Sequence, residues 1–438
     1  MILRIGIRRE DEKLRERRTP LTPEQVRALA QNHAIEVCVQ PSDIRIIPEQ
    51  KFAEAGAKIV EDLSPCPIIF GLKEIPLDDL EPSKVYVFFS HVIKGQHHNM
   101  EMLKKLLELN CTLIDYERVT DDQERRLIFF GRHAGLAGMI ETLWALGKRL
   151  SWEGIPNPFD KIRRAIGYPD LPTAKAKIAK AGRKLASRGL PESLAPIIFG
   201  FAGYGHVSQG AQEIFNLLPF QEIDPSEIDA ITKGRERFTD VIYKVVFKEE
   251  HLVEPLNSNV QFELQDYYQH PEKYHSQFSS YLPHLTVLLN CIYWDERYPR
   301  LVTKRDVQHL YSQGNQPRLR VIGDISCDIE GAIECNVRFT TSENPIYVYE
   351  PFTGQTSDGW EGHGPVVLAV FNLPSELPLE SSRDFGRVLL PFVPQLVGAD
   401  FSVDFEHCQL PLAIKKAVIV YKGKLTPQYR YLEKYLKR

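Results

Sequence analysis

The chain has 438 residues, too many for one ordinary hydrophobic core, so two domains are expected. Hydrophobic residues make up 43% of it and aromatic residues 10%, as in a packed globular protein rather than a disordered one. Lys and Arg number 54 against 58 Asp and Glu, a net charge of -4. This balance excludes nucleic acid and membrane surfaces as the main expected partners.

Apolar runs and cysteines narrow the class further. No apolar run approaches the roughly 20 residues of a membrane-spanning helix. The chain starts with a short apolar run followed by charges, the reverse of a signal peptide. Its seven cysteines stand singly, with no CxxC pair, which argues against a disulfide framework and against a zinc site. We expect a reduced, cytoplasmic, soluble protein without a metal.

The first third of the chain alternates β-type runs with helical patterns. Strands are expected at 2–7, 35–40, 67–72, 85–89 and 112–116. Helices are expected at 23–32, 48–59 and 134–150, the first with Thr22 as its N-cap and Pro23 at its first position. Strands that alternate with helices predict a parallel sheet covered on both faces.

A second α/β region follows. Residues 151–195 are rich in Lys, Arg, Ala and Pro and predict a connector with one helix at 173–188. Strands are expected at 195–203, 318–326 and 365–371, and helices at 378–394 and 426–437. Residues 225–285, charged and aromatic, fit no clear pattern.

A glycine-rich turn within PIIFGFAGYGHVSQGAQEIFNLL (196–218) is the strongest local signal. Gly203 permits a tight turn, and Gly205 lets the backbone approach a pyrophosphate at the start of the next helix. Ser208 takes the third position of the GxGxxG pattern, with Gly210 two residues later. A strand before and a helix after are the context of a dinucleotide site, although a turn without a ligand has the same pattern.

The choice between NAD and NADP stays open on spacing. An acidic residue is expected about 20 residues beyond the glycines, where it would bind the ribose. Glu222 and Asp224 are the candidates, while Lys233, Arg235 and Arg237 follow and could meet a 2′-phosphate.

Two titratable residues stand where strands of the first domain end. PIIFGLKEIP leads into Lys73, and VYVFFSHVIK leads into His91. Ligands of open α/β sheets bind outside the carboxyl ends of the strands, so neighbouring strands would bring both residues to one cleft. Histidine titrates near neutral pH, and a desolvated lysine can act as a base. Either residue alone fits a solvated strand end; the pair predicts acid/base chemistry.

Arginines crowd two segments, 13–25 and 123–132. Such arginines could bind a carboxylate substrate with two parallel hydrogen bonds. A charged surface loop explains the composition equally well.

Together these features resemble the saccharopine dehydrogenase family, within the alanine dehydrogenase and transhydrogenase superfamily. The likeness is greatest to the lysine–2-oxoglutarate reductase half of the bifunctional alpha-aminoadipic semialdehyde synthase, and the motifs of the second half are absent. The matching motifs are RREDEKLRERRTPLTP (8–23), GLKEIP (71–76), FFSHVIKGQ (88–96), LIDYE (113–117), AGLAGMI (134–140), GYGHVSQGAQEIFNLLP (203–219), NCIYWDERYPRL (290–301), GDISCDIEGAIE (323–334) and NLPSELPLESS (372–382).

The resemblance implies an α/β fold of two Rossmann-like domains with parallel sheets and an active site in the interdomain cleft. The substrate domain would comprise residues 1–140 plus 360–438. The dinucleotide-binding domain would comprise residues 190–359, with residues 141–189 as a connector.

The resemblance also implies roles for individual residues. Lys73 and His91 would be the catalytic acid/base pair. The substrate would be bound by Lys13, Glu16, Arg18, Lys94, Gln96 and Arg126. The cofactor would be bound by Arg125, Gly203, Gly205, His206, Val207, Ser208, Asp324, Ile325, Ser326 and Cys327.

The implied activity joins L-lysine to 2-oxoglutarate and reduces the imine to saccharopine, with NADPH favoured over NADH, in lysine degradation. Lys73 and His91 would share the proton transfers. One alternative is another amino-acid or opine-type NAD(P) dehydrogenase; another is a non-catalytic nucleotide-binding descendant. The sequence leaves open the direction of the reaction, the enzyme of the next step and whether the chain forms a homo-oligomer.

Overall fold

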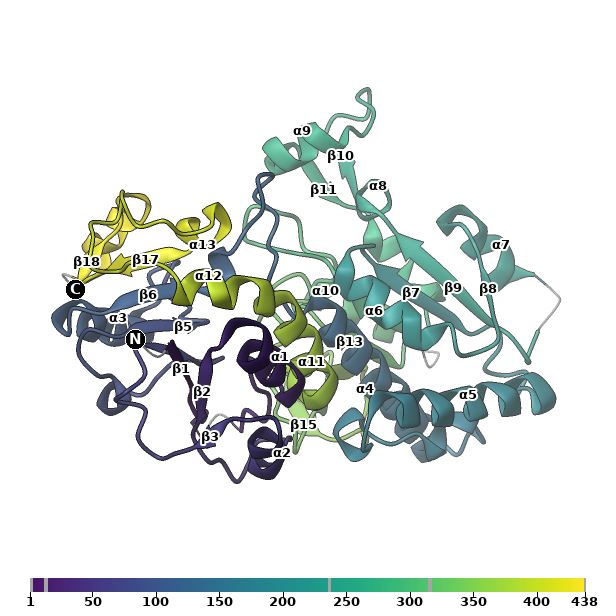
Figure 1. Cartoon of the computed structure of the whole chain (residues 1–438). Coiled ribbons are helices and arrows are strands. Elements are labelled where there is room, and N and C mark those ends of the chain that lie inside the picture. The colour runs from purple at the N-terminus through teal and green to yellow at the C-terminus, as the bar shows by residue number, and fades with distance from the viewer. Residues whose placement is uncertain (1–2, 12–14, 235–237, 314–316, 437–438) are drawn as a thin grey trace. The chain divides into compact units, whose positions relative to one another are not determined.

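The computed structural model describes residues 3–11, 15–234, 238–313 and 317–436 (Figure 1). The chain forms two compact units. Unit 1 comprises Met1–Phe130 and Pro378–Arg438, and unit 2 comprises Gly131–Leu377. No helix in these described ranges is long and apolar enough to cross a membrane.

Unit 1 contains an eight-stranded sheet in the order β18-β17-β6-β5-β4-β1-β2-β3. Its six N-terminal strands are parallel, and the C-terminal β17 and β18 add an antiparallel edge. The strands are β1 (Arg4–Ile7), β2 (Glu36–Val39), β3 (Lys58–Ile59), β4 (Ile68–Phe70), β5 (Val85–Phe88), β6 (Thr112–Asp115), β17 (Val418–Tyr421) and β18 (Lys424–Leu425). The central strands β4 and β5 are buried along their whole length, as their apolar sequences predict.

Helices of unit 1 come from both ends of the chain. They are α1 (Pro23–His33), α2 (Glu49–Glu54), α3 (His97–Glu108), α11 (Pro378–Leu389), α12 (Val393–Val397), α13 (Leu412–Lys416) and α14 (Glu433–Leu436). Thr22 is the N-cap of α1 and Pro23 its first residue, as predicted. The helices predicted at 378–394 and 426–437 are interrupted or shortened by 3-10 turns that contain prolines, at Leu390–Phe392 and Pro427–Leu432.

Unit 2 contains a second eight-stranded sheet in the order β15-β14-β16-β13-β12-β7-β9-β8. The strands run in one direction except β14, which is antiparallel to both of its neighbours, β15 and β16. The strands are β7 (Ile198–Ala202), β8 (Phe220–Glu222), β9 (Ile242–Phe247), β12 (Val287–Asn290), β13 (Val321–Asp324), β14 (Ile346–Tyr349), β15 (Thr356–Asp358) and β16 (Val366–Leu368). The two sheets of mostly parallel strands confirm the predicted α/β class.

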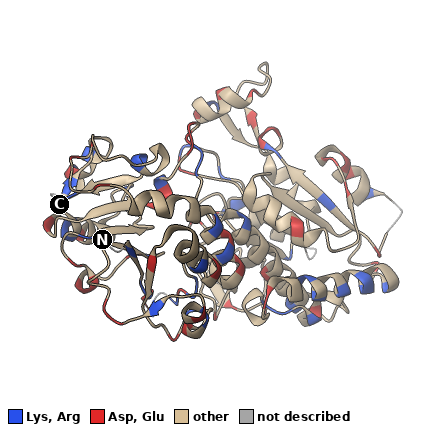
Figure 2. Ribbon diagram, viewed as in Figure 1, with Lys and Arg blue, Asp and Glu red and all other residues tan. Residues whose placement is uncertain are grey.

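One helix of unit 2 lies within the predicted connector and another extends into it. The helices are α4 (Gly131–Trp152), α5 (Leu171–Arg188), α6 (His206–Phe215), α7 (Ile228–Lys233), α8 (Glu249–Leu252), α9 (Leu264–Gln269) and α10 (Lys304–Ser312). Apolar residues of α4 and α5 pack in the core of unit 2, so residues 141–189 belong to this unit. Figure 2 marks the Lys and Arg positions along α5, of which Lys177, Lys180, Arg183 and Arg188 are exposed. The predicted bounds at 140 and 360 therefore differ from the observed ones, after Phe130 and before Pro378.

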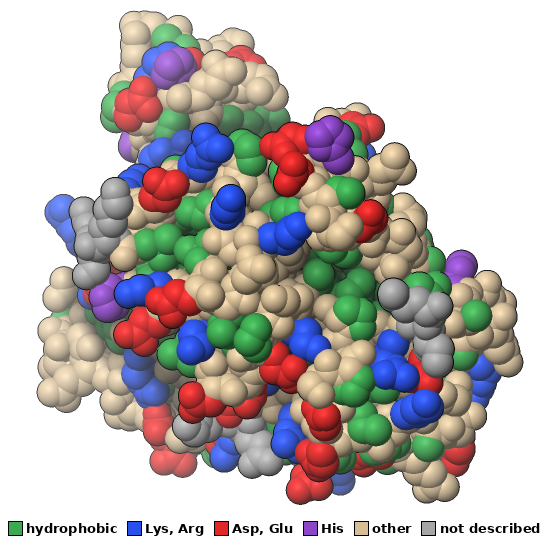
Figure 3. Space-filling view, turned by 60° about the vertical axis from the view of Figure 1, so that its left-hand side comes forward, with side chains coloured by type: hydrophobic (Ala, Val, Ile, Leu, Met, Phe, Trp, Pro, Cys, Tyr) green, Lys and Arg blue, Asp and Glu red, His purple; other side chains and the backbone are tan. Residues whose placement is uncertain are grey.

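Part of residues 225–285 forms a small arm of unit 2. The antiparallel pair β10 (Val253–Pro255) and β11 (Tyr274–Ser276) carries α9 and stands out at the top of Figures 1 and 3. Packed tyrosines hold it together, with the Tyr267 and Tyr274 ring centroids 5.2 Å apart.

Candidate active site

Lys73 and His91 follow neighbouring strands of unit 1. Strands β4 and β5 are parallel partners in the register Phe70↔Val87. The segments that follow them therefore begin at the same edge of the sheet, its carboxyl edge. Each residue comes three positions after its strand, Lys73 after Phe70 and His91 after Phe88. The expectation that the two strands are neighbours is confirmed.

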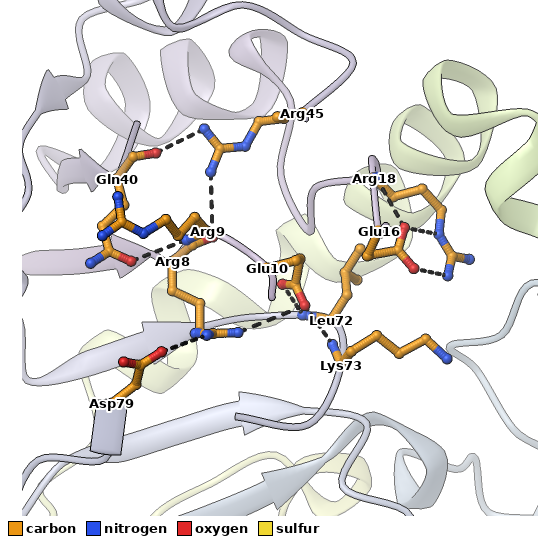
Figure 4. A network of polar contacts seen from close by, with 10 residues as sticks. All are labelled: Arg8, Arg9, Glu10, Glu16, Arg18, Gln40, Arg45, Leu72, Lys73 and Asp79. Carbon is orange, nitrogen blue, oxygen red and sulfur yellow. Dashed lines mark hydrogen bonds and ion pairs between the residues drawn. The ribbon is translucent and has the colours of Figure 1, made fainter. Parts of the chain in front are cut away.

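Lys73 lies where burial and charge favour the neutral amine. Its backbone N–H donates to Glu10 Oε2 at 2.9 Å, and the N–H of Leu72 donates to Glu10 Oε1 at 2.7 Å (Figure 4). Burial, together with the positive charge of Arg18, lowers the pKa of Lys73. A lysine in this state can accept a proton at a pH where an exposed lysine would stay charged.

His91 is paired with a carboxylate that the sequence analysis missed. Its Nδ1–H donates to Glu74 Oε1 at 2.5 Å, and Asn99 Nδ2 donates to the His91 carbonyl at 3.2 Å. Burial alone would raise the pKa of Glu74, but the hydrogen bond and charge of His91 lower it. With Nδ1 engaged, Nε2 is the ring atom that can exchange a proton with a substrate. The available signal was that Glu74 directly follows Lys73.

Ser90 and Asp115 fix the strand end beside His91. The backbone N–H of Ser90 donates to Asp115 Oδ2 at 3.1 Å, and its hydroxyl donates to the same oxygen. Asp115 ends the neighbouring strand β6, and burial raises its pKa to about 6. This contact holds the backbone from which the imidazole projects, and it was also missed.

Arg18 and Glu16 form a buried ion pair. Arg18 Nε donates to Glu16 Oε1 at 2.7 Å and Nη2 donates to Oε2 at 2.5 Å (Figure 4). The guanidinium lies 4.1 Å from the centre of the Phe130 ring. Burial would raise the pKa of Glu16, but the adjacent Arg18 charge brings it down to about 2. Glu16 therefore orients Arg18, and the predicted grip on a substrate carboxylate starts from this pair.

The Glu16 carboxylate should shape the acid denaturation of the chain. Its pKa is about 2 in the folded state against an ordinary value of 4.5, so the stability it contributes is complete above pH 4.5 and is lost as the pH falls through 2. The contribution at neutral pH is about 3 kcal/mol. Glu16→Gln should make the free energy of unfolding depend less on pH between 4.5 and 2. Urea titration at each pH measures this free energy. Glu24→Gln, exposed on α1, is the control, and the same change in it would contradict the assignment.

The other predicted substrate residues are placed as follows. Lys94 is exposed in the turn before α3. Gln96 is the N-cap residue of α3, and its buried Oε1 has no hydrogen-bond partner among the described residues. Arg126 Nη1 lies 3.7 Å from Oε1 of Glu117, which follows β6. Lys13 lies outside the described residues.

Arg125, predicted to bind the cofactor, occupies a surface turn of unit 1. Its side chain is 71% exposed, and its Nε donates to Asp121 Oδ2 at 2.7 Å. Asp121 is not a predicted site residue, so the cofactor-binding role of Arg125 stays a prediction.

The glycine turn of unit 2 has the form that a dinucleotide requires. It joins β7 to α6, and Gly203 has a φ of +91°. A Cβ at Gly205 would meet no protein atom within 4 Å, so packing of the chain does not require glycine there, whereas close approach of a phosphate does. His206 and Val207 begin α6, where backbone N–H groups point out of the helix. The residues present fit a dinucleotide.

Gly210, rather than Ser208, has the helix-packing role of the third glycine. A Cβ on Gly210 would lie 2.1 Å from the carbonyl oxygen of Arg132 on α4. Ser208 is buried, and its Oγ accepts from Gln212 Nε2 at 2.9 Å. The close crossing of α4 and α6 positions the turn at the carboxyl edge of β7.

The segment after β13 reaches the same edge. Asp324 accepts from Asn290 Nδ2 at 2.8 Å and from Asn336 Nδ2 at 2.7 Å, and burial raises its pKa to about 6. Ser326 Oγ donates to a backbone carbonyl at 2.5 Å, and Ile325 and Cys327 are buried. The Asp324 and Ser326 side chains therefore shape the loop, so a direct contact of this segment with a cofactor would come from its backbone or from conformational change.

Comparison with known proteins gives a consistent family. The model of the alanine dehydrogenase/PNT N-terminal domain matches residues 6–137, and that of the alanine dehydrogenase/PNT C-terminal domain matches residues 272–428. A solved L-alanine dehydrogenase covers 99% of both chains with a TM-score of 0.62 at 18% identity, which shows the shared fold.

Curated relatives narrow the family. The chain is 36% identical to alpha-aminoadipic semialdehyde synthase of Arabidopsis thaliana over 98% of its own length but 41% of that protein's. It is 29% identical to saccharopine dehydrogenase [NAD(+), L-lysine-forming] of Emericella nidulans, over 89% of this chain and 91% of that one. These relatives indicate an oxidoreductase with a nicotinamide cofactor. The chain belongs to the saccharopine dehydrogenase family, within the alanine dehydrogenase/PNT superfamily.

Proposed function

We propose that the chain is a lysine–2-oxoglutarate reductase, which joins the ε-amine of L-lysine to 2-oxoglutarate and reduces the resulting imine to saccharopine. The observation that carries this proposal is the placement of Lys73 and the His91–Glu74 pair after adjacent parallel strands. The name of the Emericella nidulans relative supports saccharopine and L-lysine as reactants. The chain spans less than half of the Arabidopsis relative, so they remain a proposal.

The proton transfers account for the two titratable residues. The attacking amine must be neutral, and Lys73, with its lowered pKa, can take its proton. The carbinolamine must lose its hydroxyl as water, and His91 can protonate that oxygen while Glu74 stabilises the imidazolium. A bound nicotinamide cofactor would supply the hydride that reduces the imine.

Substrate binding accounts for the polar groups around them. A dicarboxylate keto acid needs cations, which Arg18 and Arg126 provide. The buried Gln96 Oε1 offers an acceptor to an amine or hydroxyl donor of the substrate. All seven cysteines are free and buried, which suits the predicted reducing compartment, the cytoplasm.

A panel of amines tests the proposal. Initial rates of NADH or NADPH oxidation are measured with 2-oxoglutarate and one amine at a time: L-lysine, L-ornithine or ammonium. The proposal expects the highest rate with L-lysine. A higher rate with ammonium, which would form glutamate from 2-oxoglutarate, would replace it with another amino-acid dehydrogenase.

Glu74→Gln should lower kcat on the order of 10-fold, less than loss of His91 itself, because the amide no longer stabilises the charged imidazole. Steady-state kinetics with both substrates saturating gives the effect. Glu81→Gln, a carboxylate further along the same connection, is the matched control. Equal kcat in Glu74→Gln and the parent chain would contradict the role of Glu74.

A further inference from the structure

Strand order in unit 2 relocates the ribose-binding position. In a Rossmann sheet, the acidic residue that binds the ribose comes at the end of the strand beside the glycine-turn strand. The next strand in sequence, β8, does not lie beside β7. Instead β9 pairs with β7 in the parallel register from Ile198↔Tyr243 to Ala202↔Phe247, and β8 lies outside β9. The expected position is therefore the end of β9, at Lys248 and Glu249.

The residues that spacing suggested have other contacts. Glu222 ends β8, one strand too far from the turn, and its Oε2 lies 2.6 Å from Lys244 Nζ. Asp224 accepts from the backbone N–H of Ser226 at 2.9 Å and caps a 3-10 turn. Lys233 pairs with Asp229 at 2.8 Å. Arg235 and Arg237 lie outside the described residues.

Glu249 lies directly beside the glycine turn. The N–H of Gly203 donates to the carbonyl of Phe247 at 2.9 Å, which joins the turn to the end of β9. Tyr268 Oη donates to Glu249 Oε1 at 2.7 Å. Tyr204, the middle residue of the turn, is close enough to feel the same carboxylate, since burial and then the charge of Glu249 raise the pKa of Tyr204.

The cations that follow β9 interact with Asp224: after the hydrogen bonds from Ser226, the charges of His251 and Lys248 also lower the pKa of the Asp224 carboxyl. His251 Nδ1 accepts from the backbone N–H of Lys248 at 3.0 Å, and its Nε2 lies 3.8 Å from Glu250 Oε1. The Lys248 side chain is exposed. The Glu249 carboxylate, oriented by the Tyr268 hydroxyl, therefore lies beside the turn, and the charge of Glu250 acts on Tyr204 in the same direction.

We propose that Glu249 accepts hydrogen bonds from the adenosine ribose hydroxyls and selects NAD(H) over NADP(H). A carboxylate at this place binds a diol and repels a 2′-phosphate. The proposal rests on the proposed function only for its use of a dinucleotide. It replaces NADPH, which the family resemblance favoured, with NADH as the hydride donor.

Binding without substrates tests the proposal. The dissociation constants of NADH and NADPH are measured by calorimetry for the parent chain, Glu249→Gln and Glu249→Arg. The parent chain should bind NADH at least about 10-fold more tightly, since a hydrogen bond to a charged group is worth about that factor. Glu249→Gln should lower this preference for NADH over NADPH. Glu249→Arg should lower the preference further or reverse it in favour of NADPH.

Glu222→Gln is the control, because it changes the carboxylate that ends β8 instead of the one that follows β9. It should leave the ratio of the NADH and NADPH dissociation constants unchanged. Equal or tighter binding of NADPH by the parent chain would overturn the proposal. So would an unchanged ratio in both Glu249 variants, or no binding of either nucleotide. The binding measurement contains neither lysine nor 2-oxoglutarate. It therefore tests the nucleotide preference even if the proposed reductase activity is not found.

Discussion

Lys73→Met and His91→Gln should each lower kcat for lysine and 2-oxoglutarate by about 10² to 10⁴-fold, because each removes one proton-transfer group. Both residues lie at the carboxyl edge of the unit 1 sheet and are only partly buried, so neither side chain is part of the hydrophobic core. The fold should therefore survive. Stopped-flow and steady-state kinetics measure the loss, and thermal denaturation checks the fold.

The control for this pair uses residues of the same types on a nearby helix. Lys104→Met and His98→Gln change exposed side chains of α3 and should leave kcat within about twofold. Full activity in both site variants would remove Lys73 and His91 from the mechanism. Loss of nucleotide binding in either would indicate a structural effect instead.

Arg18→Met should have the largest effect on stability. It leaves the Glu16 carboxylate buried without its two-point partner, and breaking a buried pair in this way costs about 3–5 kcal/mol. The same change should raise KM for 2-oxoglutarate, because a substrate carboxylate loses its predicted cation. Urea unfolding at neutral pH and the KM at saturating lysine are the two measurements.

A double variant separates the two contributions of Arg18. Arg18→Met with Glu16→Gln removes both charges and should recover part of the lost stability but none of the lost affinity. Arg27→Met, exposed on α1, is the control for the substitution itself. A single variant as stable as the parent would contradict the account of a costly buried charge.

Local sequence patterns predicted what depends on neighbouring residues. Apolar runs predicted β4 and β5, and the residues after them predicted Lys73 and His91 at the sheet edge. The glycine turn was predicted because a tight turn and a close phosphate both require small residues. The α1 cap was predicted from Thr22 and Pro23, whose preferences are local.

Features that depend on distant pairing escaped prediction. The insertion of β9 between β7 and β8 is set by strand pairing, so counting residues from Gly203 led to Glu222, on a strand that does not lie beside β7. Packing of α4 and α5 into unit 2 likewise depends on contacts far along the chain, and composition alone suggested a connector. Glu74 was missed because its partner is 17 residues away.

The most direct test of the central claim is the mass of the product formed from L-lysine labelled with ¹⁵N at its ε-amine. The chain is incubated with this lysine, 2-oxoglutarate and NADH, and in parallel with NADPH. The account predicts saccharopine that carries the label in its secondary amine, formed faster with NADH. Nucleotide binding without any lysine-derived product would contradict the reductase assignment.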